Sequence, residues 1–110
     1  MIVEYEKRGR TAVITLNRPE ARNAVSGELA QALEEAIDKL EADDDVWVGI
    51  LAGNGPVFCA GADLKAVASG KANLGTSRGG FGGFVTLERT KPVIAAVEGP
   101  AVAGGCELVL

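Results

Sequence analysis

The chain has 110 residues, with 11 lysines and arginines, 15 aspartates and glutamates and no histidine, and its formal net charge is −4. This acidic balance, without a basic segment, argues against nucleic-acid binding through phosphate contacts. The lack of histidine removes histidine-based catalytic triads and most zinc sites, so we expect no metal site.

Two strands are predicted at the start of the chain. Residues 2–6 and 11–16 flank a turn at 8–10, and the second segment alternates apolar and polar or smaller side chains with the period of a β-strand. Pro19 ends this pattern because proline has no N–H for a strand ladder.

A helix is predicted next. Ser26 is a suitable N-cap, and an apolar stripe follows at helical spacing, formed by Leu29, Leu33, Ala36, Ile37 and Leu40. The acidic residues off this stripe are expected to form a solvated face: Glu34, Glu35, Asp38 and Glu41. The aspartates at 43–45 are expected to end the helix.

The second half of the chain alternates predicted strands and helices. Continuously apolar segments predict buried strands at 46–52 and 93–97, and a shorter strand is predicted at 57–59. Helices are predicted shortly after Ala60, over 84–89 and from Gly104. The order ββ-α-ββ-α-β-α indicates an α/β fold. The glycine-rich segment 75–83 is expected to be a flexible loop.

Two glycine-containing loops each follow a predicted strand. They are "FCAGADLK" at 58–65 and "GPAVAGGCEL" at 99–108, and neither matches a phosphate-binding loop or a dinucleotide-binding fingerprint. Small residues leave backbone N–H groups open, and two converging N–H groups can form an oxyanion hole, which stabilises negative charge on a carbonyl oxygen.

Glu107 lies three residues after Gly104, about 4.5 Å further along a helix and on nearly the same face. A carboxylate at that place could act as a general base or acid. From the residues alone, a paired or exposed structural carboxylate is the favoured interpretation of Glu107.

Three motifs occur here in the order and spacing of a known family. They are "LNRPEARNAVS" at 16–26, "FCAGADLK" at 58–65 and "KPVIAAVEGPAVAGGCEL" at 91–108. On these motifs the chain resembles the enoyl-CoA hydratase/isomerase (crotonase) family over essentially its whole length. The resemblance implies a spiral of ββα units, with residues 1–110 forming the N-terminal portion of a single crotonase-like domain, truncated before its later turns and its C-terminal oligomerisation helices. It also implies acyl-CoA substrates and a homotrimer or hexamer.

The resemblance assigns roles to individual residues. Ala62 and Gly104 match the two oxyanion-hole N–H donors, and Glu107 matches the first of two acid/base glutamates. The residues that match the segment contacting coenzyme A are Ala62, Asp63, Leu64 and Lys65. Asp63 could instead be an N-cap of the next helix.

The loop at 18–24 resembles the edge of the site that faces the pantetheine and phosphates. Arg18 or Arg22 could bind a phosphate there, and simple solvation is the alternative for both. Glu98 and Pro100 differ from the residues common in hydratases, and we expect a different substrate specificity from this departure. The second carboxylate of the hydratases would lie beyond Leu110.

The function expected from the resemblance is reversible hydration of trans-2-enoyl-CoA thioesters. The thioester itself accepts the electrons, so no cofactor is expected apart from the coenzyme A of the substrate. An isomerase or another acyl-CoA dehydratase of the same family is an alternative, and a non-catalytic fragment with weak coenzyme A binding is a rival from a different class.

Both ends of the chain and the cysteines carry further expectations. The start has neither an apolar h-region nor an Arg/Ser-rich composition, and no run approaches the ~20 apolar residues of a membrane span. We therefore expect a cytoplasmic protein. Cys59 and Cys106 are expected to be reduced and buried. The uncapped apolar run that ends at Leu110 predicts that the sequence is part of a longer chain.

Overall fold

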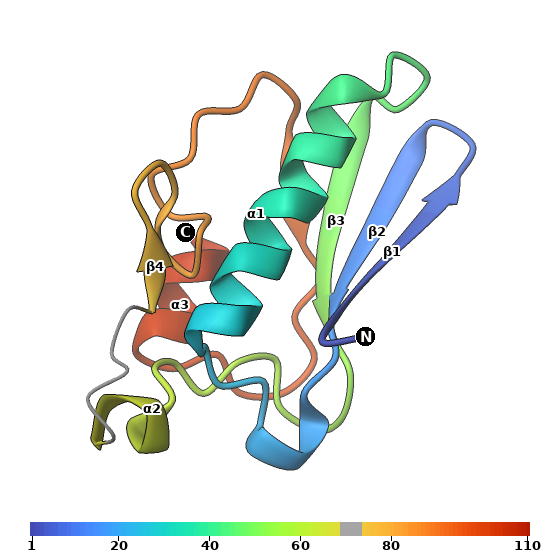
Figure 1. The fold of residues 1–110 in the computed structure, drawn as a ribbon. Coiled ribbons are helices and arrows are strands. Elements are labelled where there is room, and N and C mark those ends of the chain that lie inside the picture. Colours follow the sequence, from blue (N-terminus) through green and yellow to red (C-terminus); the bar gives the residue numbers. More distant parts are fainter. Residues whose placement is uncertain (69–73) are drawn as a thin grey trace.

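The computed structural model describes residues 1–68 and 74–110. Figure 1 shows a mixed sheet with one long helix along it and shorter elements at one end. The elements in chain order are β1 (Val3–Arg8), β2 (Thr11–Leu16), the 3-10 helix η1 (Pro19–Ala21), α1 (Gly27–Ala42), β3 (Val48–Gly53), α2 (Leu64–Ala68), β4 (Gly75–Thr76), β5 (Gly80–Phe81), β6 (Val93–Ala95) and α3 (Gly104–Val109).

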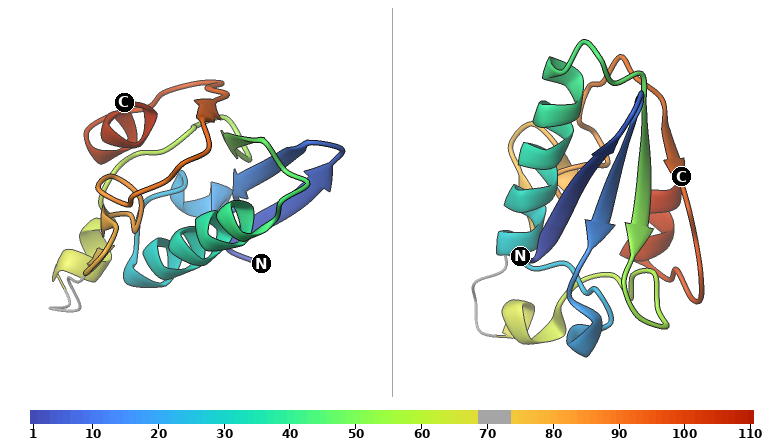
Figure 2. Two further views of the ribbon diagram at one scale, coloured as in Figure 1. Left: turned by 90° about the horizontal axis from the view of Figure 1, so that it is seen from above. Right: turned by 90° about the vertical axis from the view of Figure 1, so that its right-hand side faces the viewer.

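The main sheet has the strand order β1-β2-β3-β6. β1 and β2 form the predicted antiparallel hairpin, with Gly9 at its turn in the left-handed region (φ +59°). β2, β3 and β6 run parallel. The carboxyl ends of parallel strands share one edge of a sheet, so the segments that follow these three strands start from the same edge, at the lower end of Figure 2, right.

The predicted helix is confirmed as α1. The Ser26 hydroxyl accepts a hydrogen bond from the Leu29 N–H at 3.2 Å, as an N-cap does. All five residues of the apolar stripe are buried. α1 lies along one face of the sheet (Figures 1 and 2) and packs on its inward side chains, including Ile14 and Leu51, to form the core.

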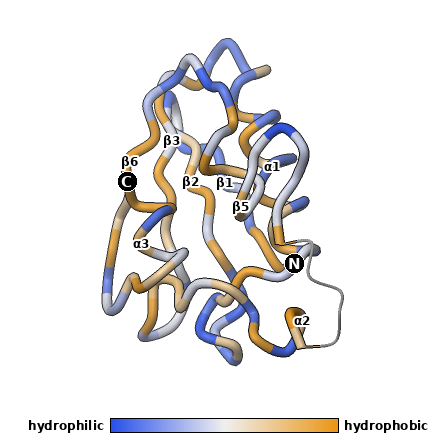
Figure 3. The backbone as a smooth tube through the Cα atoms, turned by 90° about the vertical axis from the view of Figure 1, so that its left-hand side faces the viewer, coloured by the Kyte–Doolittle hydropathy of each residue, from blue (hydrophilic) through white to orange (hydrophobic). Residues whose placement is uncertain are grey.

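The opposite face of the sheet is less covered, and two strand predictions fail there. β3 begins at Val48, and its side chains alternate between buried and half-buried, so it is not buried on both faces. β6 is shorter than the predicted 93–97, and Ile94 is 58% exposed. Ala95 is the register partner of the buried Leu51, so Ile94, one position earlier, lies on the opposite face of the sheet, which α1 does not cover. β6 is also an edge of the described sheet, because it pairs with β3 on one side only. Figure 3 shows the hydrophobic character of β6.

The segment from Leu74 to Lys91 also differs from its prediction. The glycine-rich part forms a hairpin of β4 and β5, and residues 84–89 form turns and extended chain in place of a helix. Gly82 and Gly83, just before this segment, both have positive φ and belong to the turn that follows β5. The Arg89 guanidinium donates to the carbonyls of Phe84 and Leu87, and it lies 4.1 Å from the centre of the Phe84 ring.

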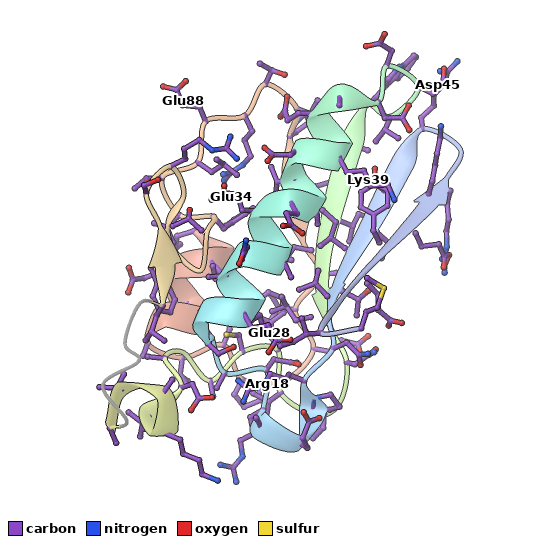
Figure 4. All side chains as sticks on the ribbon, viewed as in Figure 1. Arg18, Glu28, Glu34, Lys39, Asp45 and Glu88 are labelled. Atoms are coloured by element: carbon purple, nitrogen blue, oxygen red, sulfur yellow. The ribbon has the colours of Figure 1, made fainter. Side chains whose placement is uncertain are left out.

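Acidic side chains of α1 hold this segment in place. Arg78 donates to Glu34 at 2.6 Å and to Asp38 at 2.7 Å. Glu41 accepts hydrogen bonds from the backbone and hydroxyl of Thr90. In Figure 4, Glu34 lies on the side of α1 that faces the β4–β5 hairpin. Glu35 and Asp38 are exposed, as predicted for a solvated face, but Glu34, Asp38 and Glu41 also make intramolecular contacts.

Residues 57–59 do not form a strand. Cys59 makes an isolated parallel bridge to Ala101, and this bridge takes the place of the predicted element. Cys59 is buried and free, and its burial raises the pKa of its thiol. Cys106 is also free but is exposed, so the prediction that both cysteines are buried is wrong for Cys106. No helix within residues 1–68 and 74–110 is long and apolar enough to cross a membrane.

The N-cap of α1 generates a stability prediction. Ser26→Ala removes the acceptor of the Leu29 N–H and should lower the free energy of unfolding by about 1 kcal/mol. Urea unfolding followed by circular dichroism measures this change. Ser77→Ala, at an exposed turn position, is the matched control and should stay within about 0.5 kcal/mol of the original protein. Equal effects of the two substitutions would contradict the capping role.

Candidate functional site

The two glycine-containing loops singled out in the sequence lie side by side. The Phe58 N–H donates to the Pro100 carbonyl at 3.0 Å, and the Val102 N–H donates to the Cys59 carbonyl at 3.2 Å. Together with the Cys59–Ala101 bridge, these bonds align the two loops in parallel. The loops follow β3 and β6, which are neighbours in the sheet, so strand order explains why they meet.

A third segment, which follows β2, lies on the other side of the first loop. The Ala60 N–H donates to the Arg22 carbonyl at 3.0 Å, and the Val25 N–H donates to the Gly61 carbonyl at 2.7 Å. The Asp63 N–H returns a bond to the Val25 carbonyl at 2.8 Å. Residues 60–63 are thus held by backbone hydrogen bonds to the segment 22–25.

The two predicted N–H donors, Ala62 and Gly104, come from the adjoining loops. Within the described part of the chain, neither N–H group has a hydrogen-bond acceptor. A Cβ atom built on Gly61 would lie 3.1 Å from the Gly104 nitrogen, so the backbone before Ala62 approaches the start of α3 closely. The convergence of the two N–H groups on a single oxygen remains a prediction.

The start of α3 depends on small residues. A Cβ atom on Gly105 would overlap the Cys59 carbonyl oxygen, and one on Gly104 would overlap the ring of Phe81. Ala103, just before the helix, has φ +50° and ψ −121°, a conformation that L-residues with a side chain rarely adopt. Such strain costs of order 1–3 kcal/mol and is concentrated at functional sites.

A pocket of about 380 Å³ opens between the segment after β2 and the first glycine-containing loop. It is lined by Arg18, Glu20, Ala21, Arg22, Ala24, Ala60, Ala62, Asp63, Leu64 and Lys65. This set includes every residue predicted to contact coenzyme A apart from Gly104. A larger opening of about 620 Å³, along residues 85–93, is lined by none of the predicted site residues.

Arg18 and Asp63 form an ion pair at the wall of this pocket. Arg18 Nη2 lies 2.8 Å from Asp63 Oδ2, and Arg18 Nη1 donates to the Ala24 carbonyl at 2.7 Å. The other carboxylate oxygen of Asp63 accepts from the backbone N–H groups of Lys65 and Ala66. The alternative role of Asp63 as a helix cap is therefore confirmed, and Figure 4 places Arg18 below the start of α1.

The cations of the pocket differ in their availability. Arg18 is engaged by Asp63 and by a carbonyl. Arg22 has a left-handed backbone conformation (φ 53°). Its side chain is exposed, and within the described residues it has no ion-pair partner. Lys65 is exposed as well. Arg22 and Lys65 are thus the pocket cations that a bound anion could reach without breaking an existing ion pair.

Glu107 lies on α3 and is exposed. It does not line the 380 Å³ pocket, and among residues 1–68 and 74–110 it has no ion-pair or side-chain hydrogen-bond partner. The structure therefore gives Glu107 no structural partner within the described chain. No group of three acidic, cysteine or histidine side chains in the described residues could hold a metal ion.

The sequence analysis missed Asn23, which is fully buried. A polar residue one position before the apolar Ala24 and Val25 is a weak signal by itself. Its φ of +54° belongs to the region that asparagine occupies more readily than most residues. That conformation cannot be recognised from the sequence alone.

Comparisons with known proteins give consistent matches. Residues 6–110 match the family described as enoyl-CoA hydratase/isomerase. Enoyl-CoA hydratase EchA19 of Mycobacterium tuberculosis is 44% identical over 110 residues, covering 94% of this chain and 41% of that protein. The short-chain-enoyl-CoA hydratase of Clostridium acetobutylicum is 40% identical over 112 residues, covering 98% and 43%.

Solved structures agree with these matches. The structure of enoyl-CoA hydratase EchA1 from Mycobacterium marinum superposes with a TM-score of 0.93 at 50% identity, covering 99% of this chain and 42% of that one. For carnitinyl-CoA hydratase from Mycobacterium avium the TM-score is 0.90 at 44% identity, covering 97% and 42%. The fold class predicted from the motifs is therefore confirmed, and the chain spans about two-fifths of the length of the relatives it matches.

The Arg18–Asp63 pair generates a pH-dependent prediction. The hydrogen bond from Arg18, followed by that from the Ala66 N–H, lowers the pKa of Asp63. The pair therefore stabilises the folded state above the ordinary carboxyl pKa of about 3.9, and this stabilisation is lost as the pH falls through the lower folded-state pKa. Asp63→Asn retains a capping oxygen but loses the charge. It should reduce stability at pH 7 by about 1–2 kcal/mol.

Urea unfolding across a pH series measures this effect. The difference between Asp63→Asn and the original protein should shrink as the pH falls from about 4 toward about 2. Asp44→Asn, at an exposed position, is the control for a general change in net charge. A difference that is constant with pH would contradict the ion-pair explanation.

Proposed function

The chain belongs to the enoyl-CoA hydratase/isomerase family, and we propose that the whole protein adds water reversibly across the double bond of a trans-2-enoyl-CoA thioester. The observation that carries the proposal is the meeting of two adjoining backbone loops, each with an N–H group that lacks an acceptor in the described chain. The first of these loops, at 58–65, borders a pocket with exposed cations. Relatives named as enoyl-CoA hydratases support the choice of reaction.

In this proposal the N–H groups of Ala62 and Gly104 hold the thioester oxygen. Addition of water to the β-carbon moves electron density onto that oxygen and forms an enolate. Two fixed donors stabilise this charge without reorganisation during the reaction. Backbone N–H groups suit the role because they bring no side chain into the site, and the glycines of both loops allow the close approach.

Coenzyme A would lie along the 380 Å³ pocket. Arg22 and Lys65 are its exposed cations and would bind phosphate groups. Arg18 is held by Asp63, so its role would be to position the pocket wall. Ala62, Asp63 and Leu64 would contact the substrate mainly along the backbone, and the Leu64 side chain is 78% exposed at the pocket.

Glu107 would position the attacking water and activate it as a general base. It lies one helical turn beyond Gly104, and it has no competing partner among the described residues. A hydratase of this family uses a second carboxylate as well. We propose that this second group comes from sequence following Leu110, since the chain spans about two-fifths of its relatives.

The proposal extends to cofactor, assembly and location. The thioester serves as the electron sink, so the reaction would use no cofactor besides the coenzyme A of its substrate. The family resemblance supports a homotrimer or hexamer. The free thiols of Cys59 and Cys106 suit a reducing compartment such as the cytoplasm.

A second candidate reaction is the hydration or dehydration of another acyl-CoA. The neighbours named as carnitinyl-CoA hydratase and carnitinyl-CoA dehydratase from Mycobacterium avium favour it, at 44% identity each.

The test is to supply the whole protein with crotonyl-CoA and follow loss of the enoyl thioester absorbance. Turnover supports the hydratase proposal. Turnover of a different acyl-CoA alone supports the second candidate, and coenzyme A binding without any turnover supports the non-catalytic alternative.

Glu107 provides a direct test of the mechanism. Glu107→Gln keeps the shape of the side chain but cannot exchange a proton, and removal of a general acid or base typically costs ~10²–10⁴ in rate. The loss should fall mainly on kcat, because the backbone donors and the pocket remain. Steady-state kinetics normalised to folded protein measure it. Glu88→Gln, at an exposed loop position, is the control. If the activity of Glu107→Gln stays within about threefold of that of the unaltered protein, Glu107 has no part in the mechanism.

Arg22 tests the coenzyme A pocket. Arg22→Ala removes an exposed cation and should raise KM by about three- to tenfold with kcat nearly unchanged, because a remote phosphate contact contributes mainly uniform binding. The increase should shrink at high salt. Arg10→Ala, at the distant β1–β2 turn, is the matched control. A lowered kcat with unchanged KM would contradict phosphate binding by Arg22.

A further inference from the structure

Asn23 is the one fully buried polar or charged side chain in the part of the chain that the structure describes. Burial of an amide is costly unless its polar atoms are hydrogen-bonded. Asn23 also has a left-handed backbone conformation, with φ +54°. Both features require an explanation, and the reaction proposed above does not use this residue.

Every polar atom of the Asn23 side chain has a partner. Its Oδ1 accepts from the Arg18 backbone N–H at 2.7 Å. Its Nδ2 donates toward three carbonyl oxygens, those of Asn54, Val57 and Phe58, at 3.0, 2.9 and 3.0 Å. The amide therefore ties the segment after β2 to the segment after β3.

The backbone around Asn23 continues the same connection. The Cys59 thiol donates to the Asn23 carbonyl at 3.1 Å. On either side, Arg22 and Val25 make the backbone hydrogen bonds that hold residues 60–63. Asn23 thus lies at the junction from which both the Arg22 side of the pocket and the Ala62 N–H take their positions.

The site requires the chemistry of an asparagine amide. An aspartate would keep the acceptor but would place a carboxylate oxygen against three carbonyl oxygens. A glycine would keep the left-handed conformation but would lose all four contacts. The space is closed on the far side as well, because a Cβ atom on Gly53 would lie 3.0 Å from Asn23 Nδ2.

We propose that Asn23 is a positioning residue: its buried amide sets the location of the Ala62 N–H relative to the cation-bearing wall of the pocket, and thereby supports both turnover and coenzyme A affinity. This inference rests on the proposed function for its kinetic consequences. Its structural consequence, the ordering of residues 58–66, does not depend on which reaction the protein catalyses.

The experiment uses the full-length protein with Asn23→Gly and Asn23→Asp. Hydrogen exchange measured by mass spectrometry reports the ordering of residues 58–66, titration with coenzyme A reports affinity, and kcat and KM are measured on folded protein. We expect exchange in this segment to accelerate at least about tenfold in both variants, since each leaves buried carbonyls without donors. Coenzyme A affinity should fall, and kcat should fall with it.

Leu33→Ala is the matched control, because it removes a fully buried side chain of α1 outside the site. Leu33→Ala should lower global stability. The exchange rate of residues 58–66 relative to the rest of the chain should not change, and neither should the kinetic constants per folded molecule. If Asn23→Gly yields no folded protein, Asn23→Ser, which keeps one donor and one acceptor, takes its place.

Wild-type exchange, affinity and kinetics in folded Asn23→Gly would overturn the proposal, because they would show that only the backbone conformation matters. Defects in Asn23→Gly no larger than those in Leu33→Ala would overturn it as well. A full-length protein without hydratase activity would count against the proposed function. In that case exchange and coenzyme A titration still decide the role of Asn23.

Discussion

The parallel alignment of β2, β3 and β6 is the constraint on which the rest of the structure depends. Parallel pairing brings the carboxyl ends of the three strands to one edge of the sheet, and the segments that follow them therefore meet there. α1 stabilises this arrangement from one face with its buried stripe. The pocket and the two open N–H groups are consequences of where these three segments meet.

The candidate site is built largely from backbone, and this explains its composition. Loops that hydrogen-bond side by side approach too closely for large side chains. A Cβ atom on Gly105 would overlap the Cys59 carbonyl oxygen, and one on Gly61 would make a tight contact of 3.1 Å with the Gly104 nitrogen. Ala103 carries a strained conformation at the start of α3. A site of this kind can stabilise negative charge on a substrate oxygen and leaves room for the rest of the substrate.

Charge in this chain serves mainly to hold segments together. The acidic face of α1 binds Arg78 and the backbone near Thr90, and Asp63 binds Arg18 while it caps α2. Because these other charged side chains already have partners within the chain, Arg22 and Lys65 are the pocket cations that remain available to a bound anion. Asn23 has a comparable role without charge, because its amide joins two of the three segments that form the site.

The sequence by itself determined the features that depend on neighbouring residues. The Ser26 cap, the stripe of α1 and the strand Thr11–Leu16 follow from local patterns. Three motifs identified the family and six of the residues that line the pocket. The tertiary structure alone decided which of those side chains are already bound within the chain and which remain available to a ligand. Arg18 is engaged by a residue 45 positions later, and Arg89 binds the carbonyls of Phe84 and Leu87 in the segment that was predicted to be a helix. Ile94 of β6 is exposed because it lies on the sheet face that α1 does not cover. Asn23 is informative only once the three carbonyl groups that its amide binds, each more than 30 residues away along the chain, are in place. Local patterns record propensities, whereas contacts between distant residues depend on the order and direction of the strands, which no single segment encodes.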